Sequence, residues 1–357
     1  MATTSPNPLR IANIGTGLVV DWFVDACKAV EGVEHVATYS RSIERAREWG
    51  EPRGVRLFFD SLEELAASPD VDAVYVASPN ALHMRQTKQL LAAGKHVLCE
   101  KPFATTRAEA QEAFDIARAN GVVLMEALVT THTEAFRALK AALPQVGEPR
   151  TATIRTGKVS SRVPALLAGR LTNTFDPGFS GGGLMDMGVY VVEQMVALFG
   201  APQRILAMGE TFDASTIGAD PRWPLVDLGG EALCDYGTHV VNLSWSKDSD
   251  NHLPNSIQGT AGTLVYDGNL SDGVLRLLTP APSTGGYGTG EGVEEQLPYP
   301  VAPIRFEGEL RDFVAACQGD AAALEVIAWS EQVTLDSVAT MQEIRRQMNV
   351  RYPDDEI

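Results

Sequence analysis

A lysine on a proline-fixed turn is the first residue of this chain that could do chemistry. Lys101 stands in the run Glu100-Lys101-Pro102, directly after a short apolar strand predicted over residues 96–99. Pro102 has no backbone N–H and keeps Lys101 out of the helical region, so the chain turns there and the bond between them can be cis. Because ligands of open α/β sheets bind beyond the carboxyl ends of strands, Lys101 is a candidate catalytic group. Taken alone, these residues also fit an ordinary loop that carries a lysine.

Asp186 and Tyr190 form a second candidate group, in a helix predicted over residues 184–199 after three glycines at 181–183. Four residues apart, the two side chains share a helix face. Gly188 between them costs about 1 kcal/mol relative to alanine in a helix interior, which indicates close packing against a ligand ring or a backbone. The alternative is a buried tyrosine in an amphipathic helix, with the aspartate serving the first turn.

A glycine pair between a predicted strand and a predicted helix indicates a nucleotide site. The apolar strand over residues 9–14 runs into Gly15-Thr16-Gly17, and a helix follows from about Val20. Such glycines let the backbone approach a pyrophosphate, whose charge the helix N-terminus favours. The fingerprint is imperfect, since Val20 stands where a third small residue is expected, and a plain glycine turn is the alternative.

The end of the next predicted strand, residues 34–39, bears on the choice of cofactor. An NAD site usually places Asp or Glu there, to bind the ribose 2′-hydroxyl, but this chain has Ser40-Arg41. Serine and arginine suit a 2′-phosphate, so the sequence predicts NADP, with NAD as the alternative cofactor. Arg41 could instead cap the following helix, predicted over residues 43–49.

The order of predicted elements indicates two domains. Up to Glu126, strands and helices alternate as in a doubly wound parallel sheet, whereas strands between residues 203 and 266 follow one another without helices, as in an antiparallel sheet. We therefore predict an α/β fold with an N-terminal Rossmann domain over residues 1–126. A C-terminal α/β domain over residues 127–357 carries a large, mostly antiparallel open sheet for substrate binding and oligomerisation. The segment 280–300, rich in glycine and proline, is predicted to be a mobile loop.

Composition excludes several classes of function. With 46 acidic against 29 basic residues the formal net charge is −17, which disfavours nucleic acid as a partner. No apolar run approaches the roughly 20 residues that span a bilayer, and no signal peptide is predicted, so we expect a cytoplasmic protein without a membrane partner. No histidine spacing suggests a metal site. The cysteines lie far apart and are expected to be buried thiols: Cys27, Cys99, Cys234 and Cys317.

Together these motifs resemble the glucose–fructose oxidoreductase / inositol dehydrogenase (Gfo/Idh/MocA) family of NAD(P)-dependent enzymes, over nearly the whole chain. The resemblance rests on GTG at 15–17, VDAVYVASPNALH at 71–83, GKHVLCEKPFA at 94–104 and GGGLMDMGVY at 181–190. Many members have histidine where this chain has Tyr190. A tyrosine there looks most like the dihydrodiol dehydrogenase and NADP-dependent xylose dehydrogenase branch.

The resemblance implies roles for individual residues. Lys101 and Tyr190 are expected to carry the chemistry, with Asp186 beside them. Related enzymes commonly have an aromatic residue and an arginine near Val129 and Thr131, so the substrate stays open. Cofactor contacts are expected at Gly15, Thr16, Gly17, Leu18, Ser40, Arg41, Ser78, Pro79, Asn80, His83, Glu100 and Lys101. Substrate contacts are expected at Lys101, Asp186, Tyr190, His132 and Arg162.

The expected function is an NADP-dependent oxidoreductase that transfers a hydride between the nicotinamide and a sugar (aldose) or a related polyol or diol. A catalytically silent NAD(P)-binding regulator of the same fold is the alternative; it would need Gly15 and Gly17 but neither Lys101 nor Tyr190. A sugar hydrolase that oxidises its substrate transiently is a third interpretation. The expected partners are a small sugar-like substrate and further copies of the chain, as a homodimer or homotetramer formed through the C-terminal sheet.

Overall fold

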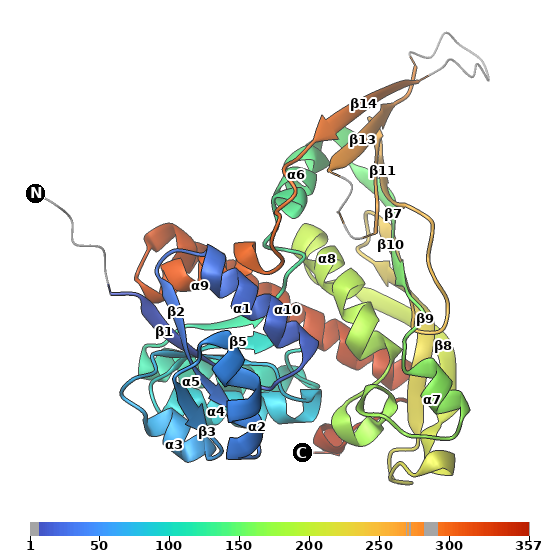
Figure 1. Cartoon of the computed structure of the whole chain (residues 1–357). Coiled ribbons are helices and arrows are strands. Elements are labelled where there is room, and N and C mark those ends of the chain that lie inside the picture. Colours follow the sequence, from blue (N-terminus) through green and yellow to red (C-terminus); the bar gives the residue numbers. More distant parts are fainter. Residues whose placement is uncertain (1–6, 269, 271–272, 282–291, 357) are drawn as a thin grey trace, which may run out of the picture. The chain divides into compact units, whose positions relative to one another are not determined.

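The computed structural model describes residues 7–268, 270, 273–281 and 292–356. It divides into two compact units (Figure 1). The first unit contains residues 1–129 and 302–338, and the second contains residues 130–301 and 339–357.

The first unit is built on a six-stranded, fully parallel sheet with the order β3-β2-β1-β4-β5-β6. This is the strand order of a Rossmann fold, as predicted. The strands are β1 (Leu9–Ile14), β2 (Val33–Tyr39), β3 (Leu57–Phe59), β4 (Ala73–Val76), β5 (His96–Glu100) and β6 (Leu124–Ala127). Every residue of β4 is buried, because a central parallel strand is covered on both faces.

Helices flank this sheet and begin where the sequence supplies caps. Ser61 and Thr106 accept hydrogen bonds from backbone N–H groups at the starts of α3 and α5, and Gly121 ends α5 in the left-handed conformation. The helices are α1 (Leu18–Ala29), α2 (Ile43–Gly50), α3 (Leu62–Ala67), α4 (His83–Ala92), α5 (Arg107–Asn120), α9 (Glu307–Cys317) and α10 (Ala321–Gln347). Residues 339–347 of α10 belong to the second unit.

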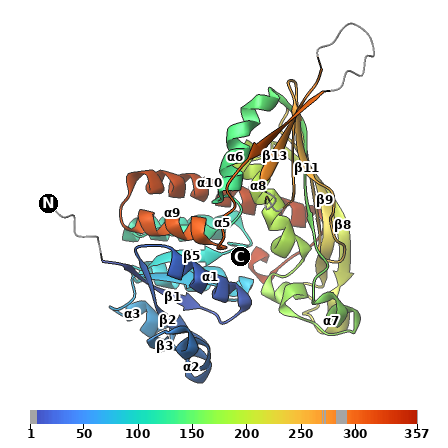
Figure 2. The same ribbon diagram turned by 45° about the horizontal axis from the view of Figure 1, so that its top comes forward.

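The first unit includes a late segment of the chain that the predicted boundary at residue 126 assigned to the second domain. Helix α9 lies beside α1 (Figure 2), and it packs Leu310, Phe313 and Val314 into the same core as Phe23 of α1. Burial of this apolar face accounts for the return of the chain to the first unit.

The second unit is built on an eight-stranded sheet with the order β14-β13-β12-β11-β7-β10-β9-β8. All neighbours pair antiparallel except β7 and β10, so the prediction of a mostly antiparallel sheet is confirmed. The strands are β7 (Pro149–Gly157), β8 (Arg204–Asp213), β9 (Leu225–Asp235), β10 (Val240–Ser246), β11 (Asn255–Gly259), β12 (Thr263–Tyr266), β13 (Val274–Thr279) and β14 (Val293–Pro298).

One face of this sheet is covered by α8 (Val189–Phe199), which lies across β7 and β10 (Figure 1). Alternate residues of β10, such as Leu243 and Trp245, are buried on that side. Large apolar side chains of β8 and β9 remain exposed within the chain: Leu206, Met208 and Leu233. The unit also contains α6 (Glu134–Ala142) and α7 (Val163–Leu167).

Three local predictions need correction. Strands β13 and β14 were not predicted, and β14 occupies part of the segment 280–300 that was expected to be a loop; residues 282–291 lie outside the described residues. The helix predicted over residues 184–199 begins as a π-helical turn, Leu184–Gly188, before α8. Short 3₁₀ turns, not predicted, occur at Glu51–Arg53, Asn80–Leu82, Leu143–Val146, Asn173–Phe175, Pro177–Phe179, Ala214–Ile217 and Pro353–Glu356.

By length and composition the stretch Pro177–Phe199 is apolar enough to cross a membrane, but 72% of its most apolar window is buried inside the protein. It is therefore weak evidence for a membrane span.

Candidate active site

The glycine turn after β1 has the backbone that a dinucleotide requires. Gly15 has a φ of 106°, and a Cβ there would lie 2.5 Å from the carbonyl oxygen of Ala77. Gly17 is the N-cap residue of α1, and no side chain caps the first N–H groups of this helix. The space where a Cβ of residue 17 would stand is open. The first N–H groups of α1 are therefore available to a pyrophosphate, and Leu18 at its start is 65% exposed. These residues fit the cofactor predicted from the sequence.

Two arginines stand at the end of β2, although the sequence analysis selected only one. Arg41 is exposed beside the buried Ser40, and Arg45 in the first turn of α2 donates from Nε to Thr16 Oγ1 at 3.0 Å. Neither arginine has a carboxylate within ion-pair distance among the residues that the structure describes. The four-residue spacing from Arg41, with Ser42 capping α2, is the signal that could have identified Arg45.

The Lys101 turn is fixed from several sides. The Lys101–Pro102 peptide bond is cis, and the Lys101 N–H donates to Glu100 Oε2 at 3.2 Å. Glu100 also accepts a hydrogen bond from the Tyr75 hydroxyl. The next N–H, that of Phe103, donates to Glu126 Oε1 at 3.0 Å. Lys101 therefore sits on a backbone whose neighbouring polar groups are held by buried carboxylates.

His83 connects the Lys101 turn to the turn after β4. Its Nδ1 lies 3.0 Å from the carbonyl oxygen of Pro102, and its Nε2 lies 2.8 Å from that of Ser78. The ring is 1% exposed, and burial lowers the pKa of His83. A neutral imidazole donates only one of these two hydrogen bonds. The structure thus places His83 beneath the turn that contains Ser78, Pro79 and Asn80, and its predicted contact with the cofactor stays a prediction.

In the second unit, Asp186 lies in the π-helical turn and Tyr190 in the first turn of α8. Asp186 forms an ion pair with Lys247, which follows the last residue of β10. The Lys247 side chain is 9% exposed and that of Asp186 is 39% exposed. Sequence analysis expected Asp186 beside Lys101 and Tyr190, as a substrate contact, and missed Lys247. Lys247 is two residues beyond the buried Trp245. Because residues two apart in a strand point to the same face, this spacing was the available signal that the Lys247 side chain lies on the buried face of the sheet.

A buried carboxylate holds the π-helical turn in place. Asp227 on β9 accepts from the Leu184 N–H at 2.7 Å and from Trp245 Nε1 at 2.9 Å, both at Oδ2. Burial raises the pKa of Asp227, against the opposing effect of these two donors. The Asp227 carboxylate packs against Gly182, whose φ is 137° and where a Cβ would overlap Asp227 Oδ1. The triple glycine therefore serves close approach of the backbone to this carboxylate.

Leu184 and Trp245 both pack against Gly188, and a Cβ there would lie 2.7 Å from Leu184 Cδ1. A Cβ at Gly188 would lie 3.1 Å from the Trp245 indole, so the close approach inferred from the sequence is to a protein ring. Trp245 and Asp227 thus both contact the π-helical turn that replaces the start of the expected α-helix.

Two further substrate candidates differ in their surroundings. His132 is 2% exposed, whereas Arg162 is exposed at the start of α7. Both belong to the second unit, as do Asp186 and Tyr190, while Lys101 belongs to the first.

Among the described residues, no group of three or more His, Cys, Asp or Glu side chains could hold a metal ion. Cys27, Cys99 and Cys234 are buried free thiols and Cys317 is partly exposed, so the expectation of four buried thiols holds for three of them.

Comparison with known families identifies the class of protein that this fold and these turns define. Residues 9–128 match an oxidoreductase family with an NAD-binding Rossmann fold, and residues 136–265 match the GFO/IDH/MocA C-terminal domain. The protein is an NAD(P)-dependent oxidoreductase that acts on CH–OH groups.

Individual relatives specify the family. The chain is 36% identical to scyllo-inositol 2-dehydrogenase (NADP(+)) IolU of Bacillus subtilis (strain 168), over 98% of this chain and 99% of that protein. It is 27% identical to trans-1,2-dihydrobenzene-1,2-diol dehydrogenase of Macaca fascicularis, over 97% of this chain and 99% of the relative. The chain therefore belongs to the Gfo/Idh/MocA family of oxidoreductases.

A solved structure has the same fold. A 3-ketoreductase from Actinomadura kijaniata in complex with TDP-benzene and NADP is 25% identical, with a TM-score of 0.75 over 97% of this chain and 99% of that chain.

Proposed function

We propose that this protein is an NADP-dependent oxidoreductase that transfers a hydride between the nicotinamide and a sugar (aldose) or a related polyol or diol. The observation that best supports this function is that Lys101 and the Gly15 turn follow strands whose carboxyl ends lie at the same edge of the sheet. Strands β1 and β5 both pair parallel with β4, so their carboxyl ends lie at one edge of the sheet, where ligands of such sheets bind.

NADP is the cofactor in this proposal. Arg41 and Arg45 support it, because two arginines without carboxylate partners suit the 2′-phosphate. The glycine turn supports dinucleotide binding in general. The name of the Bacillus subtilis relative states NADP(+), which agrees with this choice.

Lys101 and Tyr190 handle the proton. When bound, the nicotinamide accepts or donates the hydride, and oxidation of an alcohol needs a base for the hydroxyl proton. A phenol has a pKa of about 10 in water, and a nearby ammonium favours the phenolate. Lys101 supplies that ammonium and donates a hydrogen bond to the reacting oxygen, which holds it in line. Asp186 binds a neighbouring substrate hydroxyl.

The substrate class follows from the relatives and from the polar residues of the second unit. The named relatives act on scyllo-inositol and on a trans-dihydrodiol, which share vicinal hydroxyl groups. Asp186 and Lys247 offer a carboxylate and an ammonium side by side, as recognition of two neighbouring hydroxyls requires.

Initial rates with NADP⁺ against aldoses, inositols and trans-dihydrodiols test this function. Lys101→Met and Tyr190→Phe should each lower turnover by orders of magnitude while NADP⁺ affinity stays nearly unchanged. The double variant should be little worse than either single variant, because residues that act as a unit are not additive. Fully additive losses, or near-normal turnover of Tyr190→Phe, would identify another base, with His132 the next to test. Intact NADPH binding without turnover across the panel would favour the silent regulator.

Assembly and location complete the proposal. The exposed apolar side chains Leu206, Met208 and Leu233 support association through the sheet of the second unit, as a homodimer or homotetramer. The free cysteines support the expected cytoplasmic location.

A further inference from the structure

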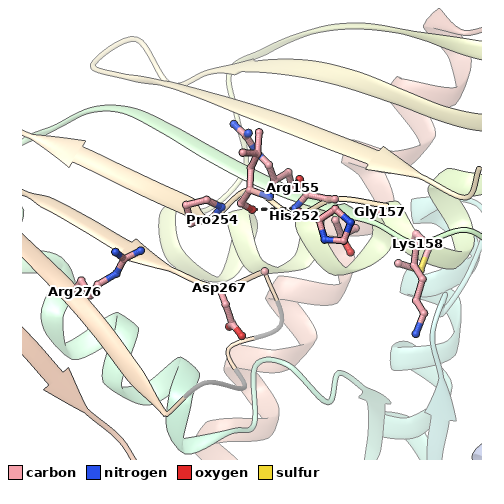
Figure 3. A pocket seen from close by; sticks show the side chains of 12 residues that line it. Arg155, Gly157, Lys158, His252, Pro254, Asp267 and Arg276 are labelled. Atoms are coloured by element: carbon pink, nitrogen blue, oxygen red, sulfur yellow. Dashed lines mark hydrogen bonds between the residues drawn. The ribbon is translucent and has the colours of Figure 1, made fainter. Parts of the chain in front are cut away.

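A cavity of about 400 Å³ lies wholly within the second unit, between the ends of β7, β11 and β12 (Figure 3). This volume suits a small organic ligand. It is lined by residues from five segments of the chain: Arg155–Lys158, Met187, Asn251–Pro254, Asp267–Gly268 and Arg276.

The lining is rich in positive charge, although the chain as a whole carries −17. Arg155, Lys158 and Arg276 line the cavity together with His252, against the single carboxylate of Asp267. In Figure 3 the three cations lie in the order Arg276, Arg155, Lys158 across the view. Cations grouped in this way repel one another and attract anions.

These cations also lack internal counterions. Among the described residues, no carboxylate lies within ion-pair distance of Arg155, Lys158 or Arg276. Other arginines of the same unit do have one, including Arg204 with Asp235 at 3.0 Å, Arg222 with Asp220 at 2.7 Å and Arg345 with Asp355 at 2.6 Å. Among the described residues, the three cations of the cavity therefore have no ion-pair partner, whereas these other arginines of the second unit do.

The backbone under Arg155 is fixed, while its guanidinium has no hydrogen-bond or ion-pair partner in the part of the chain that the structure describes. The Arg155 N–H donates to Asn255 Oδ1 at 2.8 Å, and the Asn251 N–H donates to the carbonyl oxygen of Gly157 at 2.9 Å. Arg155 Nε is buried and has no hydrogen-bond acceptor among the described residues. A rigid frame that presents an uncompensated guanidinium is a feature of anion sites.

Two residues of the lining lie close in sequence or by a backbone hydrogen bond to the Asp186–Lys247 pair. Met187, which lines it, directly follows Asp186. Lys158 donates its N–H to the carbonyl oxygen of Ser246 at 3.1 Å. Ser246 is the last residue of β10, and Lys247 follows it. The chain segments that hold Asp186 and Lys247 therefore also contribute to the lining and the frame of this cavity.

We propose that this cavity binds an anionic group, a phosphate or a carboxylate, carried by the substrate. The inference rests on the proposed function, since it uses Asp186 as the hydroxyl end of the same substrate. It narrows the sugar or polyol class to members that bear a negative charge away from the reacting carbon.

Binding measurements test the cavity independently of turnover. Protein saturated with NADP⁺, so that the cofactor occupies its own phosphate sites, is titrated by calorimetry with inorganic phosphate, D-glucose 6-phosphate and D-glucose. We expect both phosphate compounds to bind, the sugar phosphate at least tenfold more tightly than inorganic phosphate, and D-glucose more weakly than the sugar phosphate. Arg155→Gln and Arg276→Gln should each weaken sugar phosphate binding at least fivefold.

Arg150→Gln is the matched control, because Arg150 lies on the same strand as Arg155 but is exposed and paired with Glu148. It should change binding less than twofold. Three outcomes would overturn the proposal. They are no binding of phosphate, equal binding of the sugar phosphate to the wild type, Arg155→Gln and Arg276→Gln, and equal affinity for D-glucose and D-glucose 6-phosphate. Arg155 and Arg276 lie on different strands, β7 and β13. If one of the two variants fails to fold, the other still tests the proposal. Binding without turnover of any aldose or polyol would contradict the proposed function and leave the anion site standing.

Discussion

Asp186 and Lys247 form an ion pair that joins the π-helical turn to the end of β10. The lysine is almost fully buried and the aspartate is partly exposed, so the pair presents its carboxylate to solvent while the ammonium lies behind it. Lys247 therefore fixes the orientation of the Asp186 carboxylate.

Lys247→Met should lower kcat/KM about tenfold for the best substrate, because Asp186 loses the partner that orients it. The partial exposure of Asp186 screens the lost charge and keeps the effect below that of a fully buried pair. Affinity for NADP⁺, measured by fluorescence, should stay within twofold. Lys28→Met, which removes an exposed lysine paired with Asp25, is the control and should leave kcat/KM unchanged. An unchanged kcat/KM in Lys247→Met would exclude a role for this pair.

Cofactor choice can be tested at the end of β2. Arg41→Ala and Arg45→Ala should each raise KM for NADP⁺ about tenfold or more, since hydrogen bonds to charged groups contribute roughly 1.5–3 kcal/mol. KM for NAD⁺, which lacks the 2′-phosphate, should hardly change. Arg47→Ala removes a neighbouring arginine of α2 that pairs with Glu51 and should affect neither cofactor. Equal effects on NADP⁺ and NAD⁺, or a wild type that prefers NAD⁺, would remove the basis for the assignment.

Much of the fold was predictable from local patterns. The proline turn at Lys101 was predicted and is confirmed. The buried run of β4 and the caps Ser61 and Gly121 likewise have signatures within a few residues. What could not be predicted depends on partners distant in sequence. The packing of Phe313 in α9 against the first core has no local signal, nor does the pairing of β14 with β13.

The residues of the candidate site also fall into those with a local sequence signature and those that depend on partners distant in sequence. Local motifs indicated the first group: the Glu-Lys-Pro turn for Lys101, and the four-residue spacing after three glycines for Asp186 and Tyr190. Lys247 and Asp227 were missed because they act from strands 61 and 43 residues away from their partners. A single lysine or aspartate in an alternating strand gives no sign of what it will face.

A buried carboxyl in the first unit should make stability depend on pH. Glu309 on α9 is 2% exposed, and burial, with Glu100 and Asp312 nearby, raises its pKa well above the ordinary 4.5. The folded protein then holds this proton more tightly than the unfolded chain does. The contribution of Glu309 to stability is therefore highest below pH 4.5 and falls as pH rises toward the folded-state pKa.

Glu309→Gln removes this titration, so its stability relative to wild type should increase between pH 5 and pH 8. Urea unfolding at the two pH values measures the change. Glu325→Gln, at an exposed position of α10, is the control. Its stability should differ from that of the wild type by the same amount at pH 5 and at pH 8. A pH-independent effect of Glu309→Gln would mean that Glu309 ionises normally in the folded protein.

The exposed face of β8 and β9 should be an interface between copies of the chain. Leu206 and Met208 are 59% and 77% exposed within one chain, and contact with a second copy would bury them. Sedimentation should give a dimer or tetramer at micromolar concentration, and Met208→Lys should shift it toward monomer. Glu294→Lys, at an exposed position on β14 at the far edge of the same sheet, is the control. A wild type that is monomeric at these concentrations would contradict the assignment.

The π-helical turn gives the last prediction, because Asp227 holds it through two hydrogen bonds to one carboxylate oxygen. Asp227→Asn keeps an acceptor of the same shape and should retain the turn, whereas Asp227→Ala leaves the Leu184 N–H and Trp245 Nε1 buried without an acceptor. An unsatisfied buried donor costs about 1–3 kcal/mol, so the alanine variant should lose roughly that amount of unfolding free energy or more. Since Asp186 lies in the turn, turnover should fall further in Asp227→Ala than in Asp227→Asn, with NADP⁺ affinity unchanged in both. Hydrogen exchange at the Leu184 amide should be faster only in the alanine variant. Equal exchange and turnover in the two variants would mean that the turn holds its position without Asp227.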